Sequence, residues 1–130
     1  PYKEEYRQFL SEISEHQENL YVWDIFAIER VLEGAYTPYE ALDRGVLRNS
    51  VYTGGWFVNT PIMANNAERF GEKNNPYKLL ADLKNVYLVT LTGTDINDTL
   101  SYIRRHYNEN AQAKCMAEIN EVAIYRFAEE

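Results

Sequence analysis

The sequence predicts a small three-layer α/β sandwich, with a mostly parallel sheet and an antiparallel hairpin at its C-terminal end. Apolar strand-like runs alternate with helical patterns, and strands separated by helices form parallel crossover units. The last two strand-like runs follow one another directly, as the arms of a hairpin do. Because 130 residues are enough to bury a core, we expect a single α/β domain over residues 1–130.

Short runs rich in β-branched and aromatic side chains mark the strands. The clearest run spans residues 86–91, Val-Tyr-Leu-Val-Thr-Leu. The first run, at residues 20–23, is continuously apolar, which is typical of a strand buried on both faces. Further strands are expected at residues 50–56, 115–119 and 122–127, and the last two are joined at Asn120-Glu121.

Apolar residues spaced three and four apart mark the helices. In residues 2–18 such a face is formed by Tyr6, Phe9, Leu10 and Ile13. A Thr-Pro-Tyr-Glu capping box at residues 37–40 begins another helix. Further helices are expected from Ile28 to Gly34, over residues 61–70, from Pro76 to Asn85, and after Asp95, which is the expected N-cap of the last one.

The composition is typical of a globular domain and argues against some kinds of partner. With 45% hydrophobic and 25% charged residues, the chain resembles a soluble globular domain. Its 11 tyrosines against five phenylalanines favour a sheet-rich or interface-rich domain, because tyrosine suits half-wet surfaces. The net charge of -7 and the scattered cations, adjacent only at Arg104-Arg105, argue against a nucleic-acid partner and against docking on anionic lipid.

The sequence offers little for nucleophilic, metal or cofactor chemistry. The single cysteine, Cys115, cannot form an internal disulfide or a cysteine cluster for a metal, and we expect it to be a small apolar residue of its strand. His16 and His106 lie on polar helix faces, and His106 near a helix C-terminus suits the helix dipole. We therefore expect no cofactor, no metal and no catalytic residue in this segment.

A candidate binding site follows from the expected topology. Parallel α/β sheets bind ligands beyond the carboxyl ends of their strands. Three segments follow the carboxyl ends of expected strands, and together they supply carboxylates, an aromatic ring and backbone N–H groups. Each has a structural alternative: the acid as a helix cap, the glycine pair as a tight turn, the tryptophan as core. The candidate residues are Asp24, Tyr52, Gly54, Gly55, Trp56, Asn59, Thr94 and Asp95.

Several short motifs together resemble the soluble C-terminal region of bacterial polytopic membrane proteins that look like GT-C-type glycosyltransferases or uncharacterised relatives of them. They are the Trp23-Asp24 strand end, Val51-Tyr52-Thr53-Gly54-Gly55-Trp56 followed by Pro61, Asn75-Pro76, Asn85-Val86-Tyr87-Leu88-Val89, Tyr102-Ile103-Arg104-Arg105-His106-Tyr107 and Ile124-Tyr125-Arg126-Phe127. The resemblance implies a domain on the extracytoplasmic face of the cell membrane, excised from a longer chain whose membrane portion holds the catalytic residues. The start at Pro1 without Met fits such an excised segment.

Three functions are consistent with these observations. The resemblance favours a non-catalytic accessory domain that assists glycan or acceptor positioning, with the membrane portion of its own parent chain and a saccharide as partners. The alternative is a small α/β enzyme, or a nucleotide- or sugar-binding domain, with its site at the carboxyl ends of the strands. The third is a structural interaction module whose tyrosines form the interface.

Overall fold

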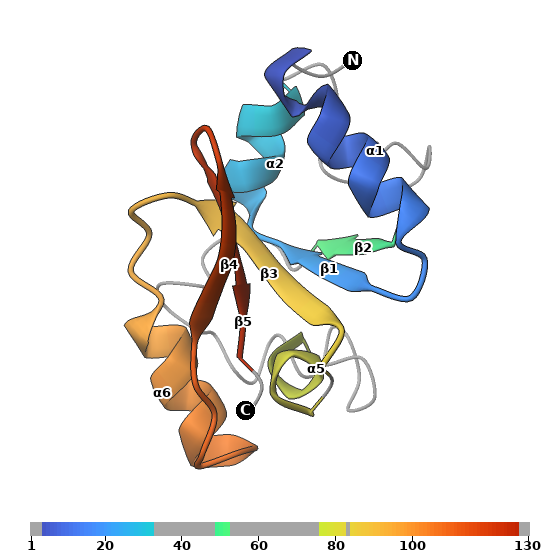
Figure 1. The fold of residues 1–130 in the computed structure, drawn as a ribbon. Coiled ribbons are helices and arrows are strands. Elements are labelled where there is room, and N and C mark those ends of the chain that lie inside the picture. Colours follow the sequence, from blue (N-terminus) through green and yellow to red (C-terminus); the bar gives the residue numbers. More distant parts are fainter. Residues whose placement is uncertain (1–3, 33–48, 53–75, 83, 128–130) are drawn as a thin grey trace.

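The computed structural model describes residues 4–32, 49–52, 76–82 and 84–127, and these residues form a small mixed α/β domain around one sheet (Figure 1). The sheet has five strands in the order β2-β1-β3-β5-β4. Their bounds are β1 (Leu20–Trp23), β2 (Ser50–Tyr52), β3 (Val86–Leu91), β4 (Lys114–Ile119) and β5 (Val122–Arg126).

Strand direction changes at β3, in the middle of the sheet. β1 pairs in parallel with both β2 and β3, whereas β5 pairs antiparallel with both β3 and β4. The prediction of a C-terminal antiparallel hairpin is confirmed. The prediction of a mostly parallel sheet is wrong, because the hairpin pairs with β3 through β5 and makes half of the strand pairings antiparallel.

The described helices begin and end close to the expected places. They are a 3₁₀ turn η1 (Glu4–Tyr6) and the helices α1 (Arg7–Glu15), α2 (Ile25–Leu32), α5 (Pro76–Asp82) and α6 (Asn97–His106). α2 begins at Ile25 rather than Ile28, because the residue before it caps the helix. The helices expected at 37–45 and 61–70, and the part of the second strand beyond residue 52, lie outside the described residues.

Apolar side chains from the central strands are buried on both faces of the sheet. Tyr21, Trp23 and Val89 pack with α1 and α2 in one cluster. Val22 and Leu88, which alternate with them, pack with α5 and α6 in a second cluster. Helices therefore cover both faces of the described sheet, as Figure 1 shows. The three-layer description stays a prediction for the whole chain, because residues 33–48 and 53–75 lie outside the described part.

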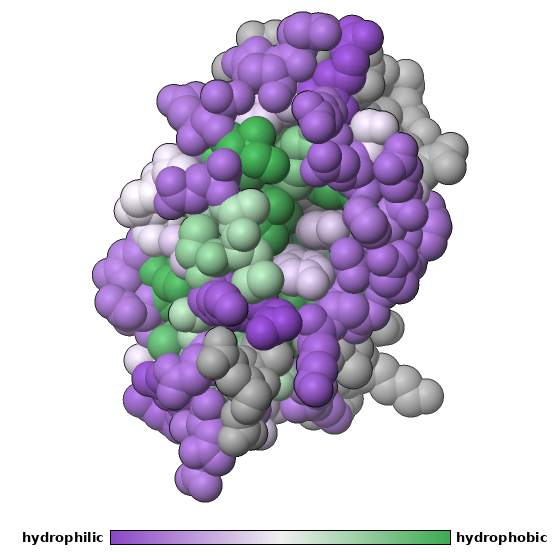
Figure 2. All heavy atoms as spheres, viewed as in Figure 1, coloured by the Kyte–Doolittle hydropathy of each residue, from purple (hydrophilic) through white to green (hydrophobic). Residues whose placement is uncertain are grey.

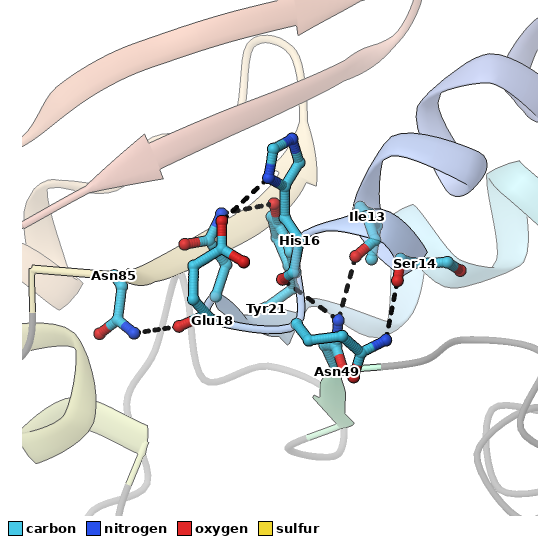
Figure 3. Close-up of polar contacts among 9 residues, drawn as sticks. Ile13, Ser14, His16, Glu18, Tyr21, Asn49 and Asn85 are labelled. Atoms are coloured by element: carbon cyan, nitrogen blue, oxygen red, sulfur yellow. Dashed lines mark hydrogen bonds and ion pairs between the residues drawn. The ribbon is translucent and has the colours of Figure 1, made fainter.

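Asparagine side chains join the end of α1 to the sheet (Figure 3). Asn49, directly before β2, has a φ of 55°, and its Nδ2 donates to the carbonyl oxygens of Ile13 (3.0 Å) and His16 (3.2 Å). Asn85, directly before β3, donates to the carbonyl oxygen of Glu18. The Asn49 bonds reach the last turn and the C-cap of α1, and the Asn85 bond reaches the segment that follows the helix. The first helix ends at Glu15, short of the expected residue 18.

The tyrosines are packed within and around the two clusters. Of those whose side chains are described, Tyr6, Tyr21 and Tyr77 are buried and the others are half-buried. Tyr21 stacks on Tyr87 with ring centroids 5.6 Å apart. Burial is the main reason why the pKa values of Tyr6, Tyr21 and Tyr125 are raised. In the described part of the chain, the tyrosines therefore lie both within the core and around its rim.

Replacing Asn49 tests the connection between α1 and the sheet. Asn49→Ala removes one partly buried and one exposed hydrogen bond and places alanine at a positive φ, so we expect the free energy of unfolding to fall by about 2–3 kcal/mol. Asn49→Gly keeps the backbone conformation and loses only the bonds, so its loss should be smaller. Urea unfolding followed by circular dichroism measures both, with the exposed Asn110→Ala as control. Equal stability of the alanine variant and the wild type would contradict this role.

The raised tyrosine pKa values predict a loss of stability in alkali. A group whose pKa is higher in the folded state stabilises the fold below its unfolded pKa, and that contribution is lost as the pH rises through the folded value. Since free tyrosine ionises near pH 10, the urea midpoint should fall above about pH 10. In Tyr125→Phe the fall should be smaller than in the wild type. An identical alkaline profile in the two proteins would argue against this explanation.

Candidate functional site

The carboxyl ends of β1 and β3 meet at Asp24. The strand register places Trp23 beside Val89, so that Asp24 lies next to Thr90. The backbone N–H of Asp24 donates to the carbonyl of Val89 at 3.0 Å. Asp24 is only 3% exposed, and its Oδ2 accepts a hydrogen bond from Oγ1 of the fully buried Thr90 at 3.0 Å. The carboxylate is therefore part of the packed interior.

Asp24 is also the residue that begins α2. Its backbone carbonyl accepts the N–H groups of Ala27 and Ile28. Its Oδ1 lies 3.4 Å from the backbone nitrogen of Phe26, which is the N–H that an N-cap side chain reaches. Asp24 thus acts as a helix cap, with one carboxylate oxygen toward the helix and the other toward Thr90.

The loop of residues 92–95 forms a turn beyond β3. The backbone N–H of Thr94 donates to the carbonyl of Leu91 at 3.2 Å, and Gly93 has a φ of 83°, which favours glycine. Asp95 is exposed, and its Oδ1 accepts the backbone N–H of Asn97 at 2.9 Å. The N-cap of α6 is Ile96 rather than Asp95, although the Asp95 carboxylate still bonds the start of the helix.

The remaining predicted residues are only partly placed. Tyr52 ends β2 beside Trp23 in the register, so β2 ends at the same side of the sheet as β1. Gly54, Gly55, Trp56 and Asn59 lie outside the described residues. The topology therefore brings the ends of β1, β2 and β3 to one side of the sheet, as expected from parallel pairing.

A hollow of about 210 Å³ lies beside α2, lined by Phe26, Glu29, Arg30 and Leu91. None of Asp24, Thr94 and Asp95 lines it. Phe26 is 39% exposed there. Nη1 of Arg30 reaches Oε2 of Glu121 in the β4–β5 turn at 2.5 Å, and this contact raises the pKa of Arg30. The hollow is thus bordered by an ion pair that links α2 to the hairpin.

Sequence reasoning missed the partner of Asp24 and the exposure of the cysteine on the edge strand. The role of Thr90 could not be predicted, because threonine is common in strands and its partner Asp24 lies 66 residues away in the sequence. Cys115, expected to be a small apolar residue of its strand, is exposed, because β4 is an edge strand. His16 and His106 are exposed at helix ends. Within the described ranges, no three His, Cys, Asp or Glu side chains converge where a metal ion could bind.

No family model, curated protein or solved structure matches this chain. None of the described helices has the length and apolar character needed to cross a membrane. The case for a function therefore depends on the residues of the chain itself.

Removing the Asp24 carboxylate should destabilise the fold. Asp24→Ala loses the cap and leaves the Thr90 hydroxyl without this acceptor, so the free energy of unfolding should fall by about 2–4 kcal/mol. Thr90→Val, which keeps the shape of the side chain, should cost about 1–2 kcal/mol. The double variant should lose less stability than the sum of the two single-variant losses, because both single changes remove the same hydrogen bond.

Urea unfolding of the wild type, the two single variants and the double variant measures this coupling. Asp24→Asn serves as the control, since it keeps an oxygen acceptor and should lose less than Asp24→Ala. A stability that is unchanged or increased in Asp24→Ala would mean that the acid is held for function rather than for folding.

Proposed function

We propose that this chain is a non-catalytic accessory domain of a membrane-embedded, glycosyltransferase-like protein. In this proposal it lies on the extracytoplasmic face, packs against the membrane portion of its own parent chain and assists the positioning of a glycan or acceptor. The motifs that resemble the C-terminal region of GT-C-type proteins motivate it. The observation that supports the non-catalytic part is the engagement of Asp24 in a buried structural contact.

A catalytic acid needs a pocket and a carboxylate that can reach the substrate. Neither of the two acids at the carboxyl ends of β1 and β3 meets both conditions. Asp24 is buried against Thr90 and the start of α2, and Asp95 is an exposed residue bonded to the backbone of α6. The hollow nearby is lined by other side chains. The arrangement therefore supports an accessory domain over an enzyme.

The edge strand β4 supports an interaction role. It pairs with β5 on one side, no described strand pairs with its other side, and residues 114–118 are exposed. Met116 is 42% exposed and lies between Cys115 and Ala117, which are also exposed. Figure 2, viewed as Figure 1 with β4 in front, shows hydrophobic atoms over this part of the sheet with hydrophilic atoms around them. Such an edge is suited to contact with another part of the parent protein.

The membrane topology of the parent protein tests the proposal. We expect the reading frame upstream of Pro1 to encode several hydrophobic spans. Alkaline phosphatase joined after Glu130 should be active, and green fluorescent protein joined at the same position should be dark, because the domain lies on the outer face. The same reporters joined in a predicted cytoplasmic loop are the control. A fluorescent fusion after Glu130, or a short reading frame without spans, would overturn the proposal and favour the small α/β enzyme or nucleotide- or sugar-binding domain.

A further inference from the structure

Charge is unevenly distributed over the described part of the molecule. Residues 4–32 contain seven acidic and two basic side chains, so their net charge is 2 − 7 = −5. Residues 104–110, at the C-terminal end of α6, contain two basic side chains and one acidic side chain, Glu109, so their net charge is 2 − 1 = +1. Figure 1 shows α1 and the C-terminal end of α6 on opposite sides of the molecule. One end of an acidic protein is therefore locally basic.

A hollow of about 460 Å³ lies at this basic end, lined by residues 104–110. It is larger than the hollow beside Phe26 and than the one of about 250 Å³ between α1 and Ile119. Arg104 holds the hollow in shape. Its Nε donates to the carbonyl of Ala111 at 2.8 Å, and its Nη2 donates to Oε1 of Gln112 at 3.1 Å. The chain after α6 is thus tied back onto the helix.

Two other donors at the hollow, the guanidinium of Arg105 and the side-chain amide of Asn108, do not hold the chain after α6 as Arg104 does. Arg105 is exposed and has no ion pair with the described residues. Asn108 accepts the backbone N–H of Asn110 with its Oδ1 at 3.0 Å, and its amide nitrogen has no hydrogen bond to the described residues. Cations in the last helical turn commonly offset the helix dipole, and Arg104 already bonds a carbonyl there. Arg105 is therefore available to a ligand.

Aromatic rings border the same hollow. The imidazole of His106 lies against the ring of Tyr102, with centroids 4.3 Å apart. Tyr107 meets Tyr102 edge-to-face at 6.1 Å, and Tyr102 in turn packs on the buried Tyr77 at 4.7 Å. The rings at the surface are thus positioned by contacts that extend into the core. Flat rings beside amide and guanidinium donors offer both surfaces that a sugar needs, one apolar and one polar.

We propose that the hollow of residues 104–110 binds an acidic saccharide, which deepens and rests on the proposed role in positioning a glycan. The guanidinium of Arg105 pairs with the acidic group, because guanidinium and carboxylate match in geometry and charge. The amide of Asn108 donates to a hydroxyl, and the rings of His106 and Tyr107 take the apolar face of the sugar. The acidic surface elsewhere repels such a ligand and directs it to this end.

The test is a titration of the ¹⁵N-labelled 130-residue chain, followed by amide chemical shifts. The probe is a hyaluronan tetrasaccharide, which carries two carboxylates, and the neutral comparison is chitotetraose. We expect saturable shifts at residues 104–110 with hyaluronan and about tenfold weaker binding of chitotetraose, the loss expected for one charge-assisted contact. Sodium acetate at matched ionic strength should give no saturable shifts.

Arg105→Ala should weaken hyaluronan binding about tenfold, while Arg7→Ala, an exposed arginine on α1, should leave it unchanged. Absent or non-saturable shifts, equal effects of the two variants, or shifts reproduced by acetate would overturn the inference. The outcome is distinct from that of the reporter fusions. If the saccharide does not bind, the inference about the hollow fails, but the topology of the parent protein found with the reporters still stands. If the C-terminus lies inside the cell, the accessory role fails, whatever this chain binds in vitro.

Discussion

The parallel pairing of β1 with β3 is the constraint on which the rest of the described structure depends. It places Asp24 beside Thr90 and lets one carboxylate bond both a strand side chain and the start of α2. Because a buried carboxylate is costly without hydrogen-bond partners, the end of β1, the side chain on β3 and the first turn of α2 are held together. The start of α2 is thereby fixed by a contact made at the end of the central strands.

The local features of the fold could be predicted from the sequence, and the non-local ones could not. The strands at 20–23 and 86–91 appear as predicted, because short apolar runs are a local signal. The position of β5 beside β3 depends on which strand edge is free in the folded sheet, and neither hairpin arm contains that information. The end of α1 depends on Asn49, 36 residues beyond Ile13, so the helical pattern alone overestimates the length of the helix.

The candidate site shows the same limit. An aspartate after a strand is equally suitable as a ligand or as a helix cap, and only its neighbours decide. Thr90 decides for Asp24, yet it lies 66 residues away along the chain. Burial of Cys115 depended on whether its strand was central or at an edge. The features for which we propose a surface role, the β4 edge and the end of α6, lie away from the carboxyl ends of the parallel strands, which explains why a rule for parallel α/β sheets did not find them.

The central claim is that the carboxyl end of β1 is a closed structural junction rather than an open site. Native-state hydrogen exchange of the Asp24 amide, which donates to the carbonyl of Val89, tests it most directly. We predict that this amide exchanges only when the whole domain unfolds, with an opening free energy equal to that measured in urea and to that of the amides in β3. An opening free energy well below that of the amides in β3 would contradict the account, because it would show that the junction opens on its own.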